Sequence, residues 1–112
     1  MANVYKNAQA TITSSGSDDP IYTVPSETTA VVKSIRLYNT DASARTVQTT
    51  ITDTSGSADY IFDNSSVLAT DSVDVLNFNN VVVLEAGDIL KMQCATADVI
   101  KVTVAVLEMT RT

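Results

Sequence analysis

The sequence alternates apolar and polar residues at every second position through most of its length. In residues 89–106, ILKMQCATADVIKVTVAV, Leu90, Met92 and Cys94 fall on one face and Gln93 on the other. This period of two is that of a half-buried β-strand, whose successive side chains point to opposite sides of a sheet. Val, Ile and Thr, which favour strands, dominate such stretches. The pattern therefore predicts an all-β protein.

We expect one domain, residues 1–112, because a chain of this length suits a single hydrophobic core. The spacing of strands and turns predicts a single-domain antiparallel β-sandwich, jelly-roll-like, with eight or nine short strands. Residues 1–13, in which small residues alternate with polar ones, are expected as an extended N-terminal arm or an edge strand. Between the longer strands, shorter ones are expected at residues 21–24, 59–63, 72–78 and 81–84.

The first of two predicted hairpins joins residues 31–37 to residues 47–51. A five-residue polar loop would place Leu37 opposite Val47 and would match the apolar faces of the two strands. In this register Val31, Ile35 and Leu37 share the core face, and Lys33 interrupts it.

The second predicted hairpin joins residues 90–94 to residues 100–104 through a three-residue loop, residues 96–98. An even-length loop would set Cys94 against Lys101 and would turn large apolar side chains to water, at about 1.5–3 kcal/mol each. Upstream, Gly87 is expected in a turn with positive φ. The predicted buried pairs are Cys94 with Ile100, Met92 with Val102, and Leu90 with Val104, with Gln93 and Lys101 exposed.

Charge and hydropathy argue against two classes of partner. The formal net charge of −6 would repel a phosphate backbone, and the seven Lys and Arg residues are spread along the chain. The sequence shows neither a basic leader followed by an apolar stretch nor a run of about 20 apolar residues. We therefore expect a protein made unprocessed in a cytosol, without nucleic-acid or membrane partners.

Residues that could perform chemistry are scarce. The chain has no histidine, so it lacks the Ser-His-Asp and Cys-His pairs and any imidazole metal ligand. Its three glycines are isolated turn residues, which make no phosphate cradle, and Cys94 lies in an apolar alternation as a small buried hydrophobe. The sequence therefore predicts no catalytic residue, no cofactor site, no metal site and no enzyme. Calcium held by turn carboxylates is an alternative, and carbohydrate binding by Tyr5, Tyr22, Tyr38 or Tyr60 is another.

Two long segments carry a resemblance to a known group of proteins. IYTVPSETTAVVKSIRLYNTDASARTVQTTITDTSGSADYIF and VLEAGDILKMQCATADVIKVTVAVLEM resemble the small all-β virion proteins of tailed bacteriophages, including cyanophages. The resemblance implies a virion structural protein, assembled in the host cytoplasm, with capsid decoration (cement) as the foremost role. Its partners would be the major capsid protein or other virion proteins, and it would be a homotrimer or a lattice-bound subunit. Neck, tail or fibre structure, or carbohydrate and receptor binding, is the alternative.

The last strand offers a candidate interface. Val102, Val104 and Val106 would face the core, yet Ala105, Leu107 and Met109 make the other face apolar too. Either the N-terminal strand folds over this second face, or a neighbouring subunit covers it. We therefore predict an interface at Tyr5, Ala105, Leu107 and Met109.

Overall fold

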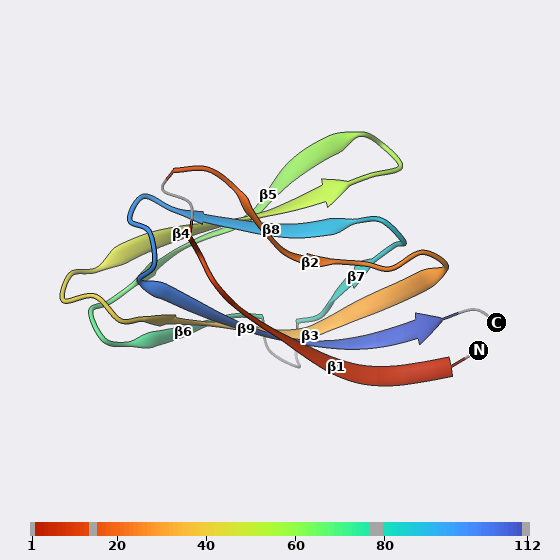
Figure 1. Ribbon diagram of the computed structural model, residues 1–112, viewed down its shortest axis with the longest axis horizontal. Helices are drawn as coiled ribbons and strands as arrows, with labels where there is room; N and C mark the ends of the chain where they lie inside the picture. Colours follow the sequence, from red (N-terminus) through yellow and green to blue (C-terminus); the bar gives the residue numbers. More distant parts are fainter. Residues whose placement is uncertain (1, 14–15, 77–79, 111–112) are drawn as a thin grey trace.

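The computed structural model describes residues 2–13, 16–76 and 80–110. These residues form nine strands in two antiparallel sheets that pack face to face (Figure 1). Sheet A has the order β1 (Ala2–Thr11), β9 (Ile100–Thr110), β3 (Thr28–Asn39) and β6 (Ser72–Leu76), and β7 (Val82–Leu84) also pairs with β3. Sheet B has the order β2 (Asp19–Thr23), β8 (Ile89–Cys94), β4 (Arg45–Asp53) and β5 (Ala58–Val67). The predicted all-β sandwich is confirmed.

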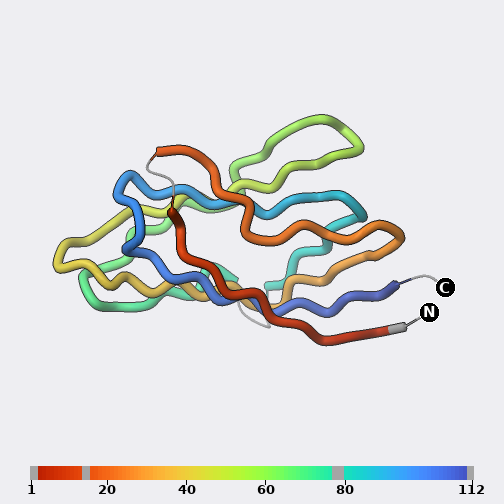
Figure 2. The backbone as a smooth tube through the Cα atoms, viewed as in Figure 1, coloured from red at the N-terminus to blue at the C-terminus, as the bar shows by residue number. Residues whose placement is uncertain are grey.

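The strand orders, β1-β9-β3-β6 in one sheet and β2-β8-β4-β5 in the other, are those of a jelly roll. The chain crosses between the sheets at most of its connections, as the tube in Figure 2 shows for β3 to β4 and β8 to β9. Strand β1 is an edge strand beside β9. An edge strand was one of the two alternatives for residues 1–13, and an extended arm was the other. The expected strand at residues 72–78 is β6, and Phe78 lies outside the described residues.

Both predicted hairpins are wrong, although the alternation that suggested them is right. Leu37 pairs with Val102 across β3 and β9, and Val47 pairs with Cys94 across β4 and β8. The pattern specifies which face of a strand is buried, but it does not specify the strand that receives its hydrogen bonds. In a sandwich, strands in opposite sheets bury their apolar faces against each other without sharing hydrogen bonds. Matching apolar faces therefore do not show that two strands are paired.

The predicted core is confirmed. Each of the six apolar side chains predicted to be buried on β8 and β9 is at most 2% exposed: Leu90, Met92, Cys94, Ile100, Val102 and Val104. They pack between the sheets with Ile35, Leu37 and Val47. Lys101 is exposed as expected, whereas Gln93, which pairs with Gln48 of β4, is half-buried rather than exposed.

A bulge in β3 reverses the predicted face of its first half. The pairing of β3 with β9 shifts between Val32 and Ser34, so that Lys33 is an extra residue in the strand. Ala30 and Val32 are therefore buried before the bulge, and Ile35 and Leu37 after it. The prediction that Val31 shares the core face is wrong, because the bulge turns Val31 to the outer face of sheet A.

The turn before β8 has the predicted conformation and is fastened to a neighbouring loop. Gly87 has φ +87°, which a residue with a side chain rarely adopts. The buried Asp88 carboxylate accepts hydrogen bonds from the backbone N–H of Glu85 (2.9 Å) and of Thr54 (3.2 Å). The Thr54 hydroxyl donates to the Gly87 carbonyl at 2.5 Å. The carboxylate of this turn therefore has a structural role.

Candidate interaction surface

The outer face of sheet A carries a continuous line of apolar side chains across four strands. The register places Tyr5 of β1 opposite Leu107 of β9, Leu107 opposite Val31 of β3, and Val31 opposite Val83 of β7. Directly opposed residues share a face of the sheet. Tyr5 is 75% exposed and Val83 60%, and Leu107 and Val31 between them are half-buried. We call Tyr5, Leu107, Val31 and Val83 the apolar row.

The structure brings the four predicted interface residues together on this face. Ala105 and Met109 lie two residues either side of Leu107 on β9, and both are half-buried. Strand β1 lies beside β9 in the same sheet, as Figure 1 shows, and Tyr5 points away from the core with the row. The alternative in which the N-terminal strand folds over this face is therefore wrong. Whether a partner covers it stays a prediction.

The sequence did not reveal Val31 and Val83 as members of the row. Val31 was assigned to the core because the prediction continued a strict alternation through Lys33, where the strand has its bulge. Val83 lies in an unbroken apolar run, residues 81–84, which has no alternation to distinguish its two faces. The two adjacent valines, Val31 and Val32, followed by a lysine were the signal that one residue breaks the period.

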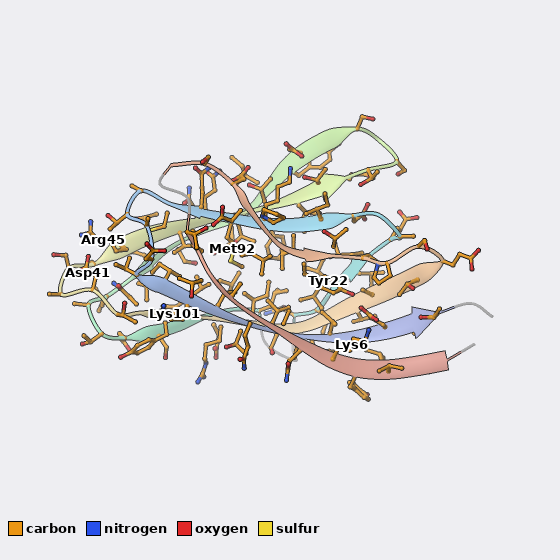
Figure 3. All side chains as sticks on the ribbon, viewed as in Figure 1. Lys6, Tyr22, Asp41, Arg45, Met92 and Lys101 are labelled. Atoms are coloured by element: carbon orange, nitrogen blue, oxygen red, sulfur yellow. The ribbon has the colours of Figure 1, made fainter. Side chains whose placement is uncertain are left out.

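The other half of the same face is polar. A shallow groove runs along the β1–β9 pair and includes Gln9, Thr11, Lys101 and Thr103 in its lining. The Lys101 ammonium donates to the Thr11 hydroxyl at 3.2 Å. Figure 3 labels Lys101 near the start of β9 and Lys6 farther along the strand pair, where it lies opposite Val106. The outer face of sheet A thus divides into an apolar end and a polar end.

A buried carboxylate joins the two sheets at the edge formed by β1 and β2. The Glu108 side chain is only 6% exposed, and its Oε1 lies 3.0 Å from the ammonium of Lys6 on β1. The Tyr22 hydroxyl on β2 donates to its Oε2 at 2.5 Å. Burial raises the pKa of Glu108, but the hydrogen bonds from Tyr22 and Lys6 outweigh that effect and hold the pKa below its usual value. Burial, followed by the bond to Glu108, raises the pKa of Tyr22. We call Glu108, Tyr22 and Lys6 the edge cluster.

The edge cluster connects β9 to the edge strands β1 and β2. Its carboxylate is fully engaged, and Lys6 is an inward-pointing charge on an edge strand, which disfavours pairing of that edge with another chain. Within residues 2–13, 16–76 and 80–110, no three His, Cys, Asp or Glu side chains are grouped so that they could hold a metal ion. Cys94 is a free thiol that lies buried in the core. The part of the chain that the structure describes contains no helix that could span a membrane.

Comparison with known proteins supports the fold. No protein-family model matches the sequence, and no curated protein matches it. Among solved structures, the chain is similar to one from Bacillus endospore appendages, which are described as a novel family of disulfide-linked pili. The TM-score is 0.59 with 11% sequence identity, over 98% of this chain and 89% of the other. At this identity the similarity extends to the fold alone.

Proposed function

We propose that the protein is a non-enzymatic structural subunit that acts through its surfaces in a larger assembly. The observation that carries the proposal is the apolar row, in which four strands present Tyr5, Leu107, Val31 and Val83 to solvent in one line. Contiguous exposed apolar surface is a mark of interaction sites in soluble proteins. The polar and ionisable groups described above are engaged in turns and at the sheet edge, which agrees with a role that needs no chemistry.

The similarity to a pilus protein agrees with this class of function, since pili are assemblies of structural subunits. The means of assembly must nevertheless differ from a disulfide link. Cys94 is the chain's one cysteine, and it is 2% exposed in the core. A thiol so placed cannot reach another subunit without unfolding, so Cys94 would not link subunits through a disulfide.

The more specific proposal is a decoration (cement) protein of a tailed-bacteriophage head, assembled in the host cytoplasm and located in the virion. Its partner would be the major capsid protein or another virion protein. The resemblance of residues 21–62 and 83–109 to phage virion proteins supports this role. Of the two assembly states expected from the resemblance, homotrimer and lattice-bound subunit, we propose the second. A fibre or tail component is the second candidate, and the similarity to an appendage protein favours it over a carbohydrate-binding module.

The test is binding to virus heads that lack the protein. Wild-type protein should co-sediment with such heads, and the double variant Leu107→Asp, Met109→Asp should bind them less, because a charged group is costly in a dry interface. Both side chains face outward, so the variant should keep its circular dichroism spectrum. Ile61→Asp is the matched control, since Ile61 is exposed on β5 of sheet B. Failure of the wild-type protein to bind heads would reject the decoration role. If a density map of the whole virus particle placed the protein in a tail or fibre, the fibre or tail role would be favoured.

A further inference from the structure

We propose that β1 is an exchangeable strand, which leaves β9 of its own chain and takes the same place against β9 of a second copy. The exchange goes beyond the proposed function, because it says how copies of the chain are joined to each other, whatever larger assembly they form. It re-forms the existing contacts of β1 between two chains and adds no new docking surface.

Strand β1 is attached to the sheet mainly through its backbone. It pairs with β9 without a break along its whole length. None of residues 3–11 is buried, and the large apolar side chains of Val4 and Tyr5 are 44% and 75% exposed. Ile12, directly after the strand, is 0% exposed and is the one buried side chain among residues 3–13. Separation of β1 from its own chain therefore removes one large apolar side chain from the core, besides the backbone hydrogen bonds of the strand.

Glu108 selects the strand that can replace β1. Its side chain is 6% exposed, and its carboxylate lies 3.0 Å from the Lys6 ammonium. A carboxylate in such a site is costly without its cation. A replacement strand must therefore present a cation where Lys6 lies and an aliphatic side chain where Ile12 lies, six residues further on. The β1 of a second copy meets both requirements in register, because it has the same sequence.

The charge of the chain is divided in a way that favours this exchange. Residues 1–13 contain Lys6 and no carboxylate, whereas the other six Lys and Arg residues and all thirteen Asp and Glu residues follow them. The exchanged strand is therefore positive, and the body that receives it is strongly negative. Contact between the surfaces of two whole chains, each with a net charge of −6, lacks this complementarity.

Protein concentration decides between a closed chain and an exchanged pair. Both states contain the same β1–β9 contacts, which is why exchange of an identical element is a low-cost route to association. The backbone N–H and the hydroxyl of Thr13 hydrogen bond to the Asp19 carboxylate (2.6 and 3.1 Å) on exposed surface, where water can replace these bonds. A tethered strand has an effective concentration on the order of 1 mM. We therefore expect closed monomers in dilute solution and exchange where copies are crowded together.

A disulfide between β1 and β9 tests the exchange. Gln9 lies directly opposite Thr103, at the Cα separation of about 4.5–5.5 Å that suits a disulfide. In the double variant Gln9→Cys, Thr103→Cys, a closed chain forms this disulfide within itself. In an exchanged pair the same disulfide joins two chains. Closed chains that merely touch would still form it internally, and the native Cys94 is buried.

The double variant is refolded from urea under reducing conditions, at about 1 mM and at about 1 µM, and is then oxidised mildly. A non-reducing denaturing gel should show several-fold more linked dimer at the higher concentration. Gln48→Cys, Asn64→Cys is the matched control, because these residues are opposed across β4 and β5, which are not exchanged. This control should stay monomeric at both concentrations.

Reversal of the charges at the edge cluster provides a second measurement. Within Lys6→Glu alone, or Glu108→Lys alone, like charges meet whether the strand closes or exchanges. In a mixture of the two variants refolded together, exchange between unlike chains restores an opposite pair at both junctions. Sedimentation velocity should therefore show more dimer, at twice 11.9 kDa, in the mixture than in either variant alone. The cysteine pair tests the exchange independently if Glu108→Lys fails to fold.

The outcomes separate this inference from the proposed function. Linked dimers of Gln9→Cys, Thr103→Cys at the higher concentration, without linked dimers of the control, support the exchange. A β1–β9 disulfide that stays within one chain at both concentrations, or equal dimer formation by the two double variants, overturns it. A protein that binds virus heads but shows no linked dimer would refute the exchange and leave the decoration role standing. Exchange in a protein that ignores heads would do the reverse.

Discussion

Removing the charge of Glu108 should destabilise the protein measurably. Glu108→Gln keeps the shape of the side chain but converts the bond from Tyr22 into a bond between neutral groups and removes the ion pair with Lys6. A hydrogen bond to a charged group contributes about 1.5–3 kcal/mol and a neutral one about 1 kcal/mol. The Lys6 side chain is 54% exposed, so solvent screens its ion pair to below about 1 kcal/mol. Relief of the desolvation of the carboxylate offsets part of the loss. We expect a net loss of about 1–2 kcal/mol.

The difference should depend on pH in a defined direction. The pKa of Glu108 is lower in the folded protein than its ordinary value. The carboxylate therefore contributes its stability above the unfolded pKa, near 4.3, and this contribution is lost as pH falls through the folded pKa. Urea unfolding of wild type and Glu108→Gln should differ most at about pH 6 and progressively less towards about pH 3.

Asp74→Asn is the matched control for this experiment. Asp74 forms an ion pair with Arg36, with N–O distance 2.8 Å, on the exposed outer face of sheet A. Water screens such a pair, so its loss should change stability little. The reasoning about the edge cluster would be refuted if Glu108→Gln unfolded at the same urea concentration as wild type. A difference that did not shrink on acidification would refute the assignment to the Glu108 charge.

Three further predictions concern the core, a turn and ligands. Leu90→Ala should cost about 2–5 kcal/mol in urea unfolding, because Leu90 is 1% exposed between the sheets; a loss below about 1 kcal/mol would contradict its place in the core. Gly87→Ala should cost about 1 kcal/mol, since its added methyl group meets only ordinary contacts while φ stays at +87°; unchanged thermal unfolding would show that the turn relaxes. Chelators, nicotinamide and flavin cofactors should leave the melting temperature unchanged, whereas a ligand at 100 times its Kd would add about 2.7 kcal/mol and reveal a site.

The sequence predicted the faces of the strands far better than their partners. Leu90, Met92 and Cys94 are buried because alternation alone determines which side of a strand is apolar. Their hydrogen-bonded partners lie on β4 and β2, which the alternation does not encode, because every apolar face fits every other. Loop length was the guide to pairing, and it failed since a short loop can also turn the chain from one sheet to the other.

The sequence predicted only part of the candidate surface, because alternation shows which face of a strand is apolar but not which strands lie beside it. Tyr5, Ala105, Leu107 and Met109 were found because β9 is long, regular and apolar on both faces. Val31 and Val83 were missed, because their orientation depends on a bulge and on pairing with β3, both of which arise from tertiary structure. The edge cluster was missed as well, since Lys6, Tyr22 and Glu108 are far apart in the sequence and meet only when β1 and β2 close the sandwich.

The strand that completes sheet A is β9, which comes last in chain order among the described strands. β9 lies between β1 and β3, so neither of these strands has that neighbour until residues 100–110 leave the ribosome. A nascent chain that ends before β9 exposes the apolar faces of Ile35 and Leu37 and two unpaired strand edges, which favour aggregation. Closure of sheet A therefore waits until β9 has been synthesised.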